Sequence, residues 1–252
     1  MTPYPWNLNG KIALVTGASG GLGAHFAAVL AAAGASVVLS ARRVDKLDEQ
    51  LARISKAGGN CSTLRLDVRD PASIAAATEV IAGVDILVNN AGLVRSGPAL
   101  DQSEADWDEV IDTNLKGMFL LAQVAARGMR ARGTGGSIIN IASVLGLRQA
   151  ASVLPYAVSK AGVIQLTKTL ALEIARYGIR VNALAPGYVD TDINGDFWET
   201  EPGKAMIGRI PQRRLGQLED FDGPLLLLAS DASAYMTGSV ITIDGGHTVN
   251  TL

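Results

Sequence analysis

The chain has 252 residues, of which 48% are hydrophobic and 18% charged, and its formal net charge is −2. This length fits one large α/β domain or two small ones, and the composition excludes a disordered chain. The nearly balanced charge argues against a nucleic-acid surface, which requires a clustered basic field.

Cysteine and histidine are too scarce for several kinds of site. Cys61 is the only cysteine, so neither an intrachain disulfide nor a thiolate metal cluster can form. His25 and His247 lie far apart in the sequence, which disfavours a histidine-based metal site and a Ser-His-Asp triad. The N-terminus does not resemble a secretory signal, and no apolar run approaches the length of a membrane span. We therefore expect a soluble, cytoplasmic protein without a metal site.

Short apolar segments rich in β-branched residues alternate along the chain with longer segments rich in alanine and leucine. Continuous apolar strands that alternate with helices are typical of a parallel sheet covered on both faces. We therefore predict an α/β protein with a doubly wound, seven-stranded parallel sheet of the Rossmann type. The predicted strands span 11–17, 36–41, 63–68, 85–90, 136–143, 179–187 and 239–246, and the predicted helices span 22–33, 44–57, 72–82, 104–131, 154–177 and 217–229.

No proline- and serine-rich linker and no repeat of fixed period divides the chain, so we expect residues 1–252 to form a single domain. Only the polar segment at about 188–216 interrupts the alternation of strands and helices. Such an insertion is often a lid or a binding loop, although it can also be an ordinary connection.

The segment TGASGGLG, residues 16–23, lies where the first predicted strand ends and the first helix begins. Its glycines, at 17, 21 and 23, allow a tight turn and a close approach of the backbone to a pyrophosphate. The helix N-terminus adds N–H groups and a favourable dipole. Many glycine-rich turns only connect elements, but this strand–turn–helix context is the one that dinucleotide binding requires.

The end of the second predicted strand discriminates between NAD and NADP. In NAD-binding folds of this type an acidic residue there binds the ribose 2′-hydroxyl. Arg42 and Arg43 occupy that zone here, and an arginine can pair with a 2′-phosphate. Asp45 is close enough to act as a displaced ribose ligand, so NAD(H) stays possible. The sequence favours NADP(H).

Further residues of interest fall where predicted strands end, and a parallel sheet brings those ends to one edge, where ligands bind. Ser143 ends the fifth predicted strand. Tyr156 lies early on the next helix and can return to the same edge. Lys160 follows one helical turn later, on the same face of that helix as Tyr156.

Four motifs occur in order at fitting intervals: TGASGGLG; NNAG at 89–92; Ser143, Tyr156 and Lys160 as S-x(12)-Y-x-x-x-K; and PGYVDT at 186–191. Together they resemble the classical short-chain dehydrogenase/reductase family over nearly the whole chain, from about residue 8 to the DGG at 244–246. Any one motif is weak, whereas their joint order and spacing are highly specific. The resemblance implies an NAD(P)(H)-dependent enzyme that reduces a ketone or ketoester to a secondary alcohol, or catalyses the reverse reaction.

The resemblance also implies the catalytic roles. Tyr156 is expected to be the general acid for reduction or the base for oxidation, and Ser143 to donate a hydrogen bond to the substrate oxygen. A free tyrosine has a pKa near ~10, and a nearby cation favours the phenolate, so Lys160 is expected to lower that pKa. Lys160 is also expected to hold the nicotinamide ribose. Asn114, inside the long fourth helix, is expected to hold a water that connects Lys160 to solvent, unless it only bends its helix.

The cofactor residues follow from the same matching. Asn90 and Gly92 are as readily explained by a role in stabilising the central sheet. Gly20 departs from the pattern, because many NADP-preferring members carry a basic residue there, so the 2′-phosphate would rely on Arg42, with Arg43 and Ser19. The implied residues are Gly17, Ser19, Gly21, Leu22 and Gly23 at the pyrophosphate; Arg42 and Arg43 at the 2′-phosphate; Asp67 and Val68 at the adenine; Asn90, Ala91 and Gly92 at the adenosine ribose; Tyr156 and Lys160 at the nicotinamide ribose; and Pro186, Gly187, Val189 and Thr191 at the carboxamide.

The substrate wall is expected from 93–96, 144–153 and the 188–216 loop. Because 144–153 is largely apolar, we expect a carbonyl with an apolar substituent. Arg148 could bind an acidic substrate, although a solvent-facing role fits it better. The expected substrate residues are Ser143, Leu145, Val153, Tyr156 and Trp198, with Phe197 beside Trp198 as a cap.

Three other functions compete with this one. A 3-oxoacyl-[acyl-carrier-protein] reductase needs basic residues for its acidic partner, and Arg127, Arg130 and Arg132 could serve, but Leu172 stands where such reductases often carry a second basic residue. A non-catalytic dinucleotide sensor or scaffold is less favoured, because both the tyrosine and the lysine are present. Family epimerases and dehydratases usually have a larger C-terminal region. By resemblance we expect a homotetramer, or a dimer, that pairs helices 104–131 and 154–177 and the C-terminal strands across two-fold axes.

Overall fold

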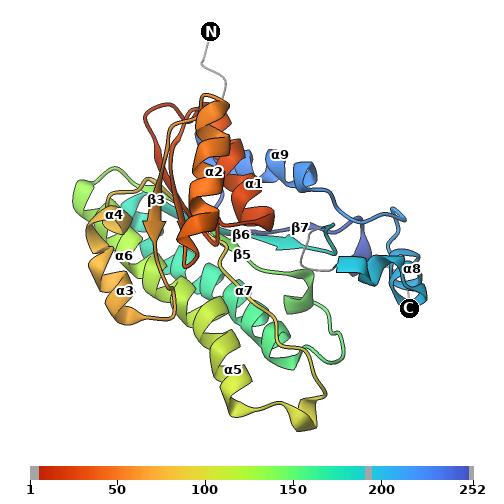
Figure 1. Cartoon of the computed structure of the whole chain (residues 1–252). Helices are drawn as coiled ribbons and strands as arrows, with labels where there is room; N and C mark the ends of the chain where they lie inside the picture. The colour runs from red at the N-terminus through yellow and green to blue at the C-terminus, as the bar shows by residue number, and fades with distance from the viewer. Residues whose placement is uncertain (1–5, 191–194, 250–252) are drawn as a thin grey trace.

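The computed structural model describes residues 6–190 and 195–249. Their strands form one sheet in the order β3-β2-β1-β4-β5-β6-β7, with every neighbouring pair parallel (Figure 1). The strand order reverses between β1 and β4, which is the switch point where ligands bind in such sheets. The predicted doubly wound fold is confirmed. The strands are β1 (Ile12–Thr16), β2 (Ser36–Ala41), β3 (Cys61–Arg65), β4 (Ile86–Asn89), β5 (Gly136–Ile141), β6 (Ile179–Pro186) and β7 (Val240–Ile243).

Helices cover both faces of the sheet (Figure 1). On one face, buried side chains of α1 (Gly21–Ala32), α2 (Val44–Lys56) and α9 (Asp222–Ala229) share an apolar cluster with β1 and β2. On the other face, α3 (Pro71–Ala76), α4 (Thr78–Ala82) and α6 (Gly117–Arg132) pack with α7 (Leu154–Ile174) against β1, β4 and β5. Burial on both faces explains why the central strands are continuously apolar.

Three predicted strands end two or three residues earlier in the structure. The strand expected at 63–68 runs from 61 to 65 and ends as the Asp67 carboxylate accepts a hydrogen bond from the Arg69 N–H at 3.0 Å. The strand expected at 136–143 ends at Ile141, so Ser143 lies two residues beyond it and caps a short turn. The last strand ends at Ile243, because Gly245 and Gly246 take positive φ angles of 59° and 87°.

The predicted helices are also interrupted. The helix expected at 72–82 is divided at Ala77 into α3 and α4. The helix expected at 104–131 consists of α5 (Glu104–Ile111), a π-helical segment (Asp112–Lys116) and α6. The first residues of the helix expected at 217–229 form a 3₁₀ turn (Leu218–Phe221) before α9.

One helix was missed by the sequence analysis. Helix α8 (Glu201–Ile207) lies within the segment that we expected to be a loop. Thr200 caps its N-terminus by accepting a hydrogen bond from the Gly203 N–H at 3.2 Å. Pro202 lies in the first turn, where proline is tolerated, so it starts this helix rather than breaking it.

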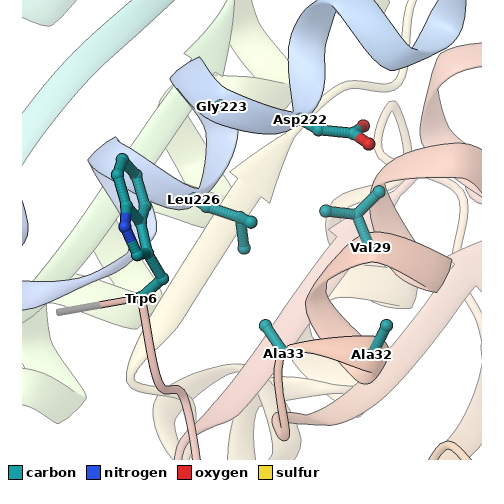
Figure 2. Close-up of a pocket in the computed structure, with 7 residues that line it drawn as sticks. All are labelled: Trp6, Val29, Ala32, Ala33, Asp222, Gly223 and Leu226. Carbon is teal, nitrogen blue, oxygen red and sulfur yellow. The ribbon is translucent and has the colours of Figure 1, made fainter. Parts of the chain in front are cut away.

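A cavity of about 530 Å³ lies between α1 and α9 (Figure 2). In Figure 2, Val29 and Ala32 of α1, with Ala33 just beyond its end, face Leu226 of α9, and Trp6 closes one side. Val29 and Ala32 belong to the C-terminal half of α1, whereas the glycine turn at 16–23 leads into its N-terminal end. The cavity is therefore separate from the edge of the sheet that carries the predicted site residues.

A buried polar chain joins the centre of the sheet to α7. Asn89 donates to the Asn140 side-chain oxygen at 3.0 Å, and Asn140 donates to Thr167 Oγ1, also at 3.0 Å. All three residues are 0% exposed. Thr167 in turn donates to the Val163 carbonyl at 2.8 Å. Such a chain fixes the position of α7 relative to β4 and β5, because a buried polar group that loses its hydrogen-bond partner costs free energy of folding.

Asn140→Leu should lower the free energy of unfolding by about 2 kcal/mol, because it leaves the Asn89 donor and Thr167 without their buried partner. Urea denaturation measures the change. Thr242→Val, on an exposed position of β7, is the matched control and should change stability by less than about 0.5 kcal/mol. Equal midpoints for the two variants would contradict a stabilising role for the chain.

Candidate active site

The carboxyl ends of four neighbouring strands bring most of the predicted site residues to one edge of the sheet. The glycine turn follows β1, Asn90 follows β4, Ser143 follows β5 and Gly187 follows β6. The strand register aligns these ends, since Ile141 pairs with Leu184 and Asn89 pairs with Asn140. Most of the described residues that were predicted for cofactor and substrate therefore lie along a single edge.

Tyr156 and Ser143 are brought together by the packing of a short loop on α7. Gly146, in the turn after Ser143, lies so close to α7 that a Cβ atom would stand 2.7 Å from the Lys160 carbonyl carbon. Pro155 lies in the first turn of α7 and fixes where Tyr156 enters the helix. Ser143 is 6% exposed, and its hydroxyl accepts a hydrogen bond from the Leu145 N–H at 3.1 Å.

The Lys160 ammonium is buried beneath Tyr156. Its side chain is 3% exposed, its Nζ donates to the Ile141 carbonyl oxygen at 2.7 Å, and Nζ lies 5.6 Å from the centre of the Tyr156 ring. Burial disfavours the charged form and lowers the pKa of Lys160 to about 8. A group with this pKa gains and loses its charge close to neutral pH.

The expectation of a lowered pKa for Tyr156 is wrong for the structure described here, although Lys160 lies beside its ring. Burial raises the pKa of the Tyr156 phenol, and a side-chain hydrogen bond with Ser143 lowers it by a smaller amount. The physical reason is that the same dry surroundings that lower the pKa of Lys160 also oppose a phenolate. At neutral pH Tyr156 is therefore an uncharged phenol, which is the form that can donate a proton.

Asn114 is fully buried within the π-helical segment. Its side-chain oxygen accepts from the Leu93 N–H at 2.8 Å, and its amide donates to the Leu93 carbonyl at 2.9 Å and to Ser159 Oγ at 3.1 Å. Ser159 in turn donates to the Tyr156 carbonyl at 2.7 Å. Asn114 thus ties the first residue of the predicted substrate wall to the turn of α7 that carries Tyr156.

The glycine turn has the shape that a pyrophosphate requires. A Cβ atom on Gly23 would stand 2.3 Å from the Gly17 carbonyl oxygen, so the chain itself demands glycine there. Gly17 and Gly21 have positive φ angles of 69° and 52°. Cβ atoms on Gly20 and Gly21 would meet nothing within 4 Å, which leaves room for a bound phosphate. The turn therefore fits a dinucleotide, with Leu22 half-buried behind it.

Two arginines stand beside this turn. Arg42 and Arg43 follow β2 and are exposed, and Arg43 Nη2 donates to Ser19 Oγ at 3.1 Å. The charge of Arg42 also helps to lower the pKa of Asp67 across the sheet edge. Burial alone would raise that pKa, but hydrogen bonds from Arg69 and the neighbouring cations outweigh it. Exposed guanidinium groups at the end of β2 suit a 2′-phosphate better than a bare ribose hydroxyl.

The remaining predicted cofactor residues have local contacts of their own. Asn90 Nδ2 donates to the Thr16 carbonyl at 2.9 Å, and Thr16 Oγ1 accepts from the N–H groups of Asn90 and Ala91, both at 3.0 Å. These bonds show that Asn90 holds β4 to the glycine turn. A Cβ on Gly92 would come within 3.2 Å of Asn114. Val68 and Val189 are buried, Pro186 ends β6, and Thr191 lies outside the described residues.

The predicted substrate wall is assembled from two loops. The Gly97 N–H donates to the Ser152 carbonyl at 2.9 Å, which joins the loop after β4 to the loop after β5. Leu145, Val153 and Trp198 are each half-buried. Arg148 is exposed, as expected, and it also donates from Nε and Nη2 to the Thr248 carbonyl at 2.9 and 2.6 Å.

Two residues in this region were not singled out as substrate residues. The Tyr188 ring lies between Trp198 and His247, with ring centres 5.6 and 5.3 Å away and steep interplanar angles. Tyr188 was detectable as part of the PGYVDT motif. His247 had no such signal, because its place beside Tyr188 depends on the turn that follows β7.

No group of three or more histidine, cysteine or acidic side chains in residues 6–190 and 195–249 could hold a metal ion. The same residues contain no helix that is long and apolar enough to cross a membrane.

Comparisons with known proteins place the chain in a family. A family model described as enoyl-(acyl carrier protein) reductase matches residues 17–248. The chain is 40% identical over 246 residues to 2-dehydro-3-deoxy-D-gluconate 5-dehydrogenase of Escherichia coli K12, with 96% of each chain covered. It is 38% identical to the 3-oxoacyl-[acyl-carrier-protein] reductase FabG of Vibrio cholerae, covering 95% of this chain and 98% of that one.

A solved structure agrees. A putative 2-deoxy-D-gluconate 3-dehydrogenase from Agrobacterium tumefaciens, crystallised with NADP, superposes with a TM-score of 0.92 at 44% identity, covering 98% of this chain and 99% of that one. The chain therefore belongs to the classical short-chain dehydrogenase/reductase family and is an NAD(P)-dependent oxidoreductase that interconverts a carbonyl group and an alcohol.

Proposed function

We propose that the chain uses NADP(H) to interconvert the ketone and secondary-alcohol forms of a sugar acid, with Tyr156 as the acid–base residue. The observation that carries the proposal is the joint placement of Tyr156 beside Ser143 and above the buried Lys160 ammonium, at the edge where the glycine turn ends. The similarity to a 2-dehydro-3-deoxy-D-gluconate dehydrogenase supports the substrate class, and the NADP-bound neighbour supports the cofactor.

The cofactor, when bound, supplies or accepts the hydride, and this chain supplies position and the proton. In the direction of reduction, the Ser143 hydroxyl donates a hydrogen bond to the carbonyl oxygen and orients it. The Tyr156 phenol gives its proton to that oxygen, so the product is the neutral alcohol. The Lys160 ammonium stabilises the phenolate that Tyr156 becomes, and Asn114 is proposed to hold the water that returns a proton.

The proposed cofactor contacts follow the edge of the sheet. Gly17, Ser19 and Gly21 would hold the pyrophosphate, as would Leu22 and Gly23. Arg42 and Arg43 would hold the 2′-phosphate, Asp67 and Val68 the adenine, and Asn90, Ala91 and Gly92 the adenosine ribose. Lys160 and Tyr156 would meet the nicotinamide ribose, and the segment from Pro186 through Gly187 and Val189 to Thr191 its carboxamide.

The second candidate is 3-oxoacyl reduction on acyl carrier protein, which the FabG similarity keeps open. The structure weighs against it, because two of the three arginines proposed for that acidic partner already have local roles. Arg130 stacks on Tyr177 at 5.4 Å, and Arg132 donates to the carbonyls of Ala82 and Val84. Leu172 is an apolar side chain that is 82% exposed. Sugar-acid chemistry is therefore preferred.

A homotetramer, or a dimer, is proposed by analogy with the family. Large apolar side chains stand exposed on α6 and α7, among them Phe119 at 40%, Leu154 at 44% and Leu172. Such side chains are usual at interfaces between subunits. A cytoplasmic location and a lid role for 188–216 also stay predictions.

Tyr156→Phe should lower kcat for carbonyl reduction by about 10²- to 10⁴-fold, because it removes the proton donor and keeps the ring. The loss of reduced-nicotinamide absorbance measures turnover, and fluorescence titration measures NADPH binding. The dissociation constant for NADPH should change little. Normal turnover by this variant would show that the assigned acid is wrong.

Arg42→Asp should shift the cofactor preference from NADPH towards NADH by about tenfold or more, because it replaces a cation at the 2′-phosphate with an acid that repels it. The ratio of kcat/KM for the two cofactors is the readout. Arg65→Asp, at the end of β3, is the matched control for the change in charge. An unchanged ratio in Arg42→Asp would refute the phosphate assignment.

The pH dependence follows from Lys160. Its pKa, lowered by burial to about 8, means that the ammonium is present below that pH and is lost above it. Because kcat/KM for NADPH reports groups of the free enzyme, we expect it to be level at low pH and to fall by up to about tenfold per pH unit above pH 8. Lys160→Met should lack this alkaline limb. A wild-type profile that stays level through pH 8 would contradict the role of the ammonium.

A further inference from the structure

We infer that Trp198 and His247 bind the oxygen-rich end of the substrate, the carboxylate and neighbouring hydroxyls of a sugar acid. The inference rests on the proposed function and adds the residues that select the substrate. Trp198 was expected as part of a cap on an apolar substrate wall, whereas the inference gives a role to its indole nitrogen and adds His247 as a second nitrogen donor.

The first observation is a pair of buried nitrogen atoms without hydrogen-bond partners. Five buried side-chain atoms lack a partner within the part of the chain that the structure describes, and Trp198 Nε1 and His247 Nδ1 are two of them. Both belong to rings that lie against the same residue, Tyr188. Buried polar atoms are nearly always paired, so two unpaired nitrogens around one ring call for a ligand that pairs with them.

The second observation is the position of this cluster beside the proposed reaction site. The Ala142 N–H donates to the Leu184 carbonyl at 2.8 Å, which sets Ser143 level with the end of β6 on the neighbouring strand. Tyr188 lies two residues beyond Pro186, where β6 ends. Neighbouring strands lie about 4.8 Å apart and each residue advances about 3.3 Å, so Tyr188 is within a sugar acid's length of Ser143.

The third observation is that His247 is held firmly in this place. The Asp244 carboxylate accepts hydrogen bonds from the N–H groups of Gly246 at 2.9 Å and Thr248 at 2.7 Å, which fixes the turn that carries His247. A Cβ on Gly187 would stand 2.8 Å from the Asp244 Cα, so the turn lies directly on the end of β6. Arg148, from the loop between Ser143 and Tyr156, donates to the Thr248 carbonyl and so also holds this turn.

The chemistry of these groups selects an oxygen-rich, anionic ligand end. An indole N–H can only donate, and an imidazole Nδ1 donates in one neutral tautomer and in the charged form. Arg148 reaches the turn, and the charge of Arg209 acts on Tyr188, where it opposes the rise in pKa that burial causes. The Asp244 carboxylate also lies in this turn, but it is engaged by the N–H groups of Gly246 and Thr248. A carboxylate or sugar hydroxyl satisfies both nitrogens, whereas an alkyl chain would leave them unpaired.

Neither nitrogen is reached by water in this conformation, so a substrate oxygen meets them only after the side chains turn. The ring of Phe197 packs on the Trp198 ring, with 5.1 Å between the ring centres, and Phe197 is 40% exposed. The indole therefore lies next to a side chain that borders solvent. Catalytic and binding hydrogen bonds commonly form only in the complex.

Binding of D-gluconate to the full chain with NADP⁺ present, measured by calorimetry, tests the inference. Trp198→Phe removes the N–H and keeps a ring, and His247→Leu removes the imidazole nitrogens. Each should weaken gluconate binding on the order of tenfold and raise KM for gluconate oxidation more than it lowers kcat. His247→Asn keeps a donor near the position of Nδ1 and should restore most of the binding. Trp107→Phe, on α5, is the matched control and should bind as the wild type does.

The outcomes separate this inference from the proposed function. The inference is overturned if Trp198→Phe and His247→Leu bind gluconate as tightly as the wild type does and thermal melting shows that both variants are folded. This holds even if the protein reduces ketones. Absence of gluconate binding by a wild type that reduces apolar ketones overturns it as well. Binding that weakens as expected in a protein that oxidises no alcohol upholds the inference and refutes the proposed reaction.

Discussion

One hydrogen bond sets the geometry of the site, from the Lys160 ammonium to the carbonyl oxygen of Ile141 at 2.7 Å. Ile141 is the last residue of β5, and Ser143 follows two residues later. Tyr156 stands one helical turn before Lys160 on α7. The bond therefore fixes the helix that bears the proposed acid against the strand that bears its hydroxyl partner.

The surrounding chain accommodates this bond at several points. Gly146 lacks a side chain where the loop after Ser143 crosses α7 at Lys160. The chain of Asn89, Asn140 and Thr167 holds α7 to the sheet further along, and Asn114 holds its first turn through Ser159. Burial that lowers the pKa of Lys160 also raises that of Tyr156, so one dry environment prepares a lysine that titrates near neutral pH and a phenol that keeps its proton.

Much of the arrangement follows from local sequence. The continuous apolar strands predict a parallel sheet, and the glycine turn predicts the edge where ligands bind. Both signals can be read from the sequence because each depends only on the residue pattern or backbone conformation of a short segment. The spacing of Tyr156 and Lys160 predicts their shared helix face. The π-helical segment around Asn114 could not be predicted, since nothing in DTNLK distinguishes it from ordinary helix. Helix α8 was hidden by Gly203 and Pro202, which are typical of loops.

The features that sequence reasoning missed depend on contacts between distant segments. The pKa of Tyr156 depends on burial, which is a property of the folded chain and not of the motif. His247 meets Tyr188, and Arg148 meets Thr248, only because β6 and β7 are neighbours in the sheet. The substrate wall was expected to be apolar, but it also contains two buried nitrogen atoms, Trp198 Nε1 and His247 Nδ1. Only the structure shows that these atoms lack hydrogen-bond partners.

The most direct test of this account is a measurement of the pKa of Lys160 by NMR titration of the protein labelled at lysine side chains, with Lys160→Met to assign the resonance. The account predicts a midpoint at about 8, because the ammonium is buried against the Ile141 carbonyl. A midpoint near the ordinary lysine value of about 10.4 would mean that the ammonium is in water, and would contradict the proposed arrangement of Lys160, Tyr156 and Ser143.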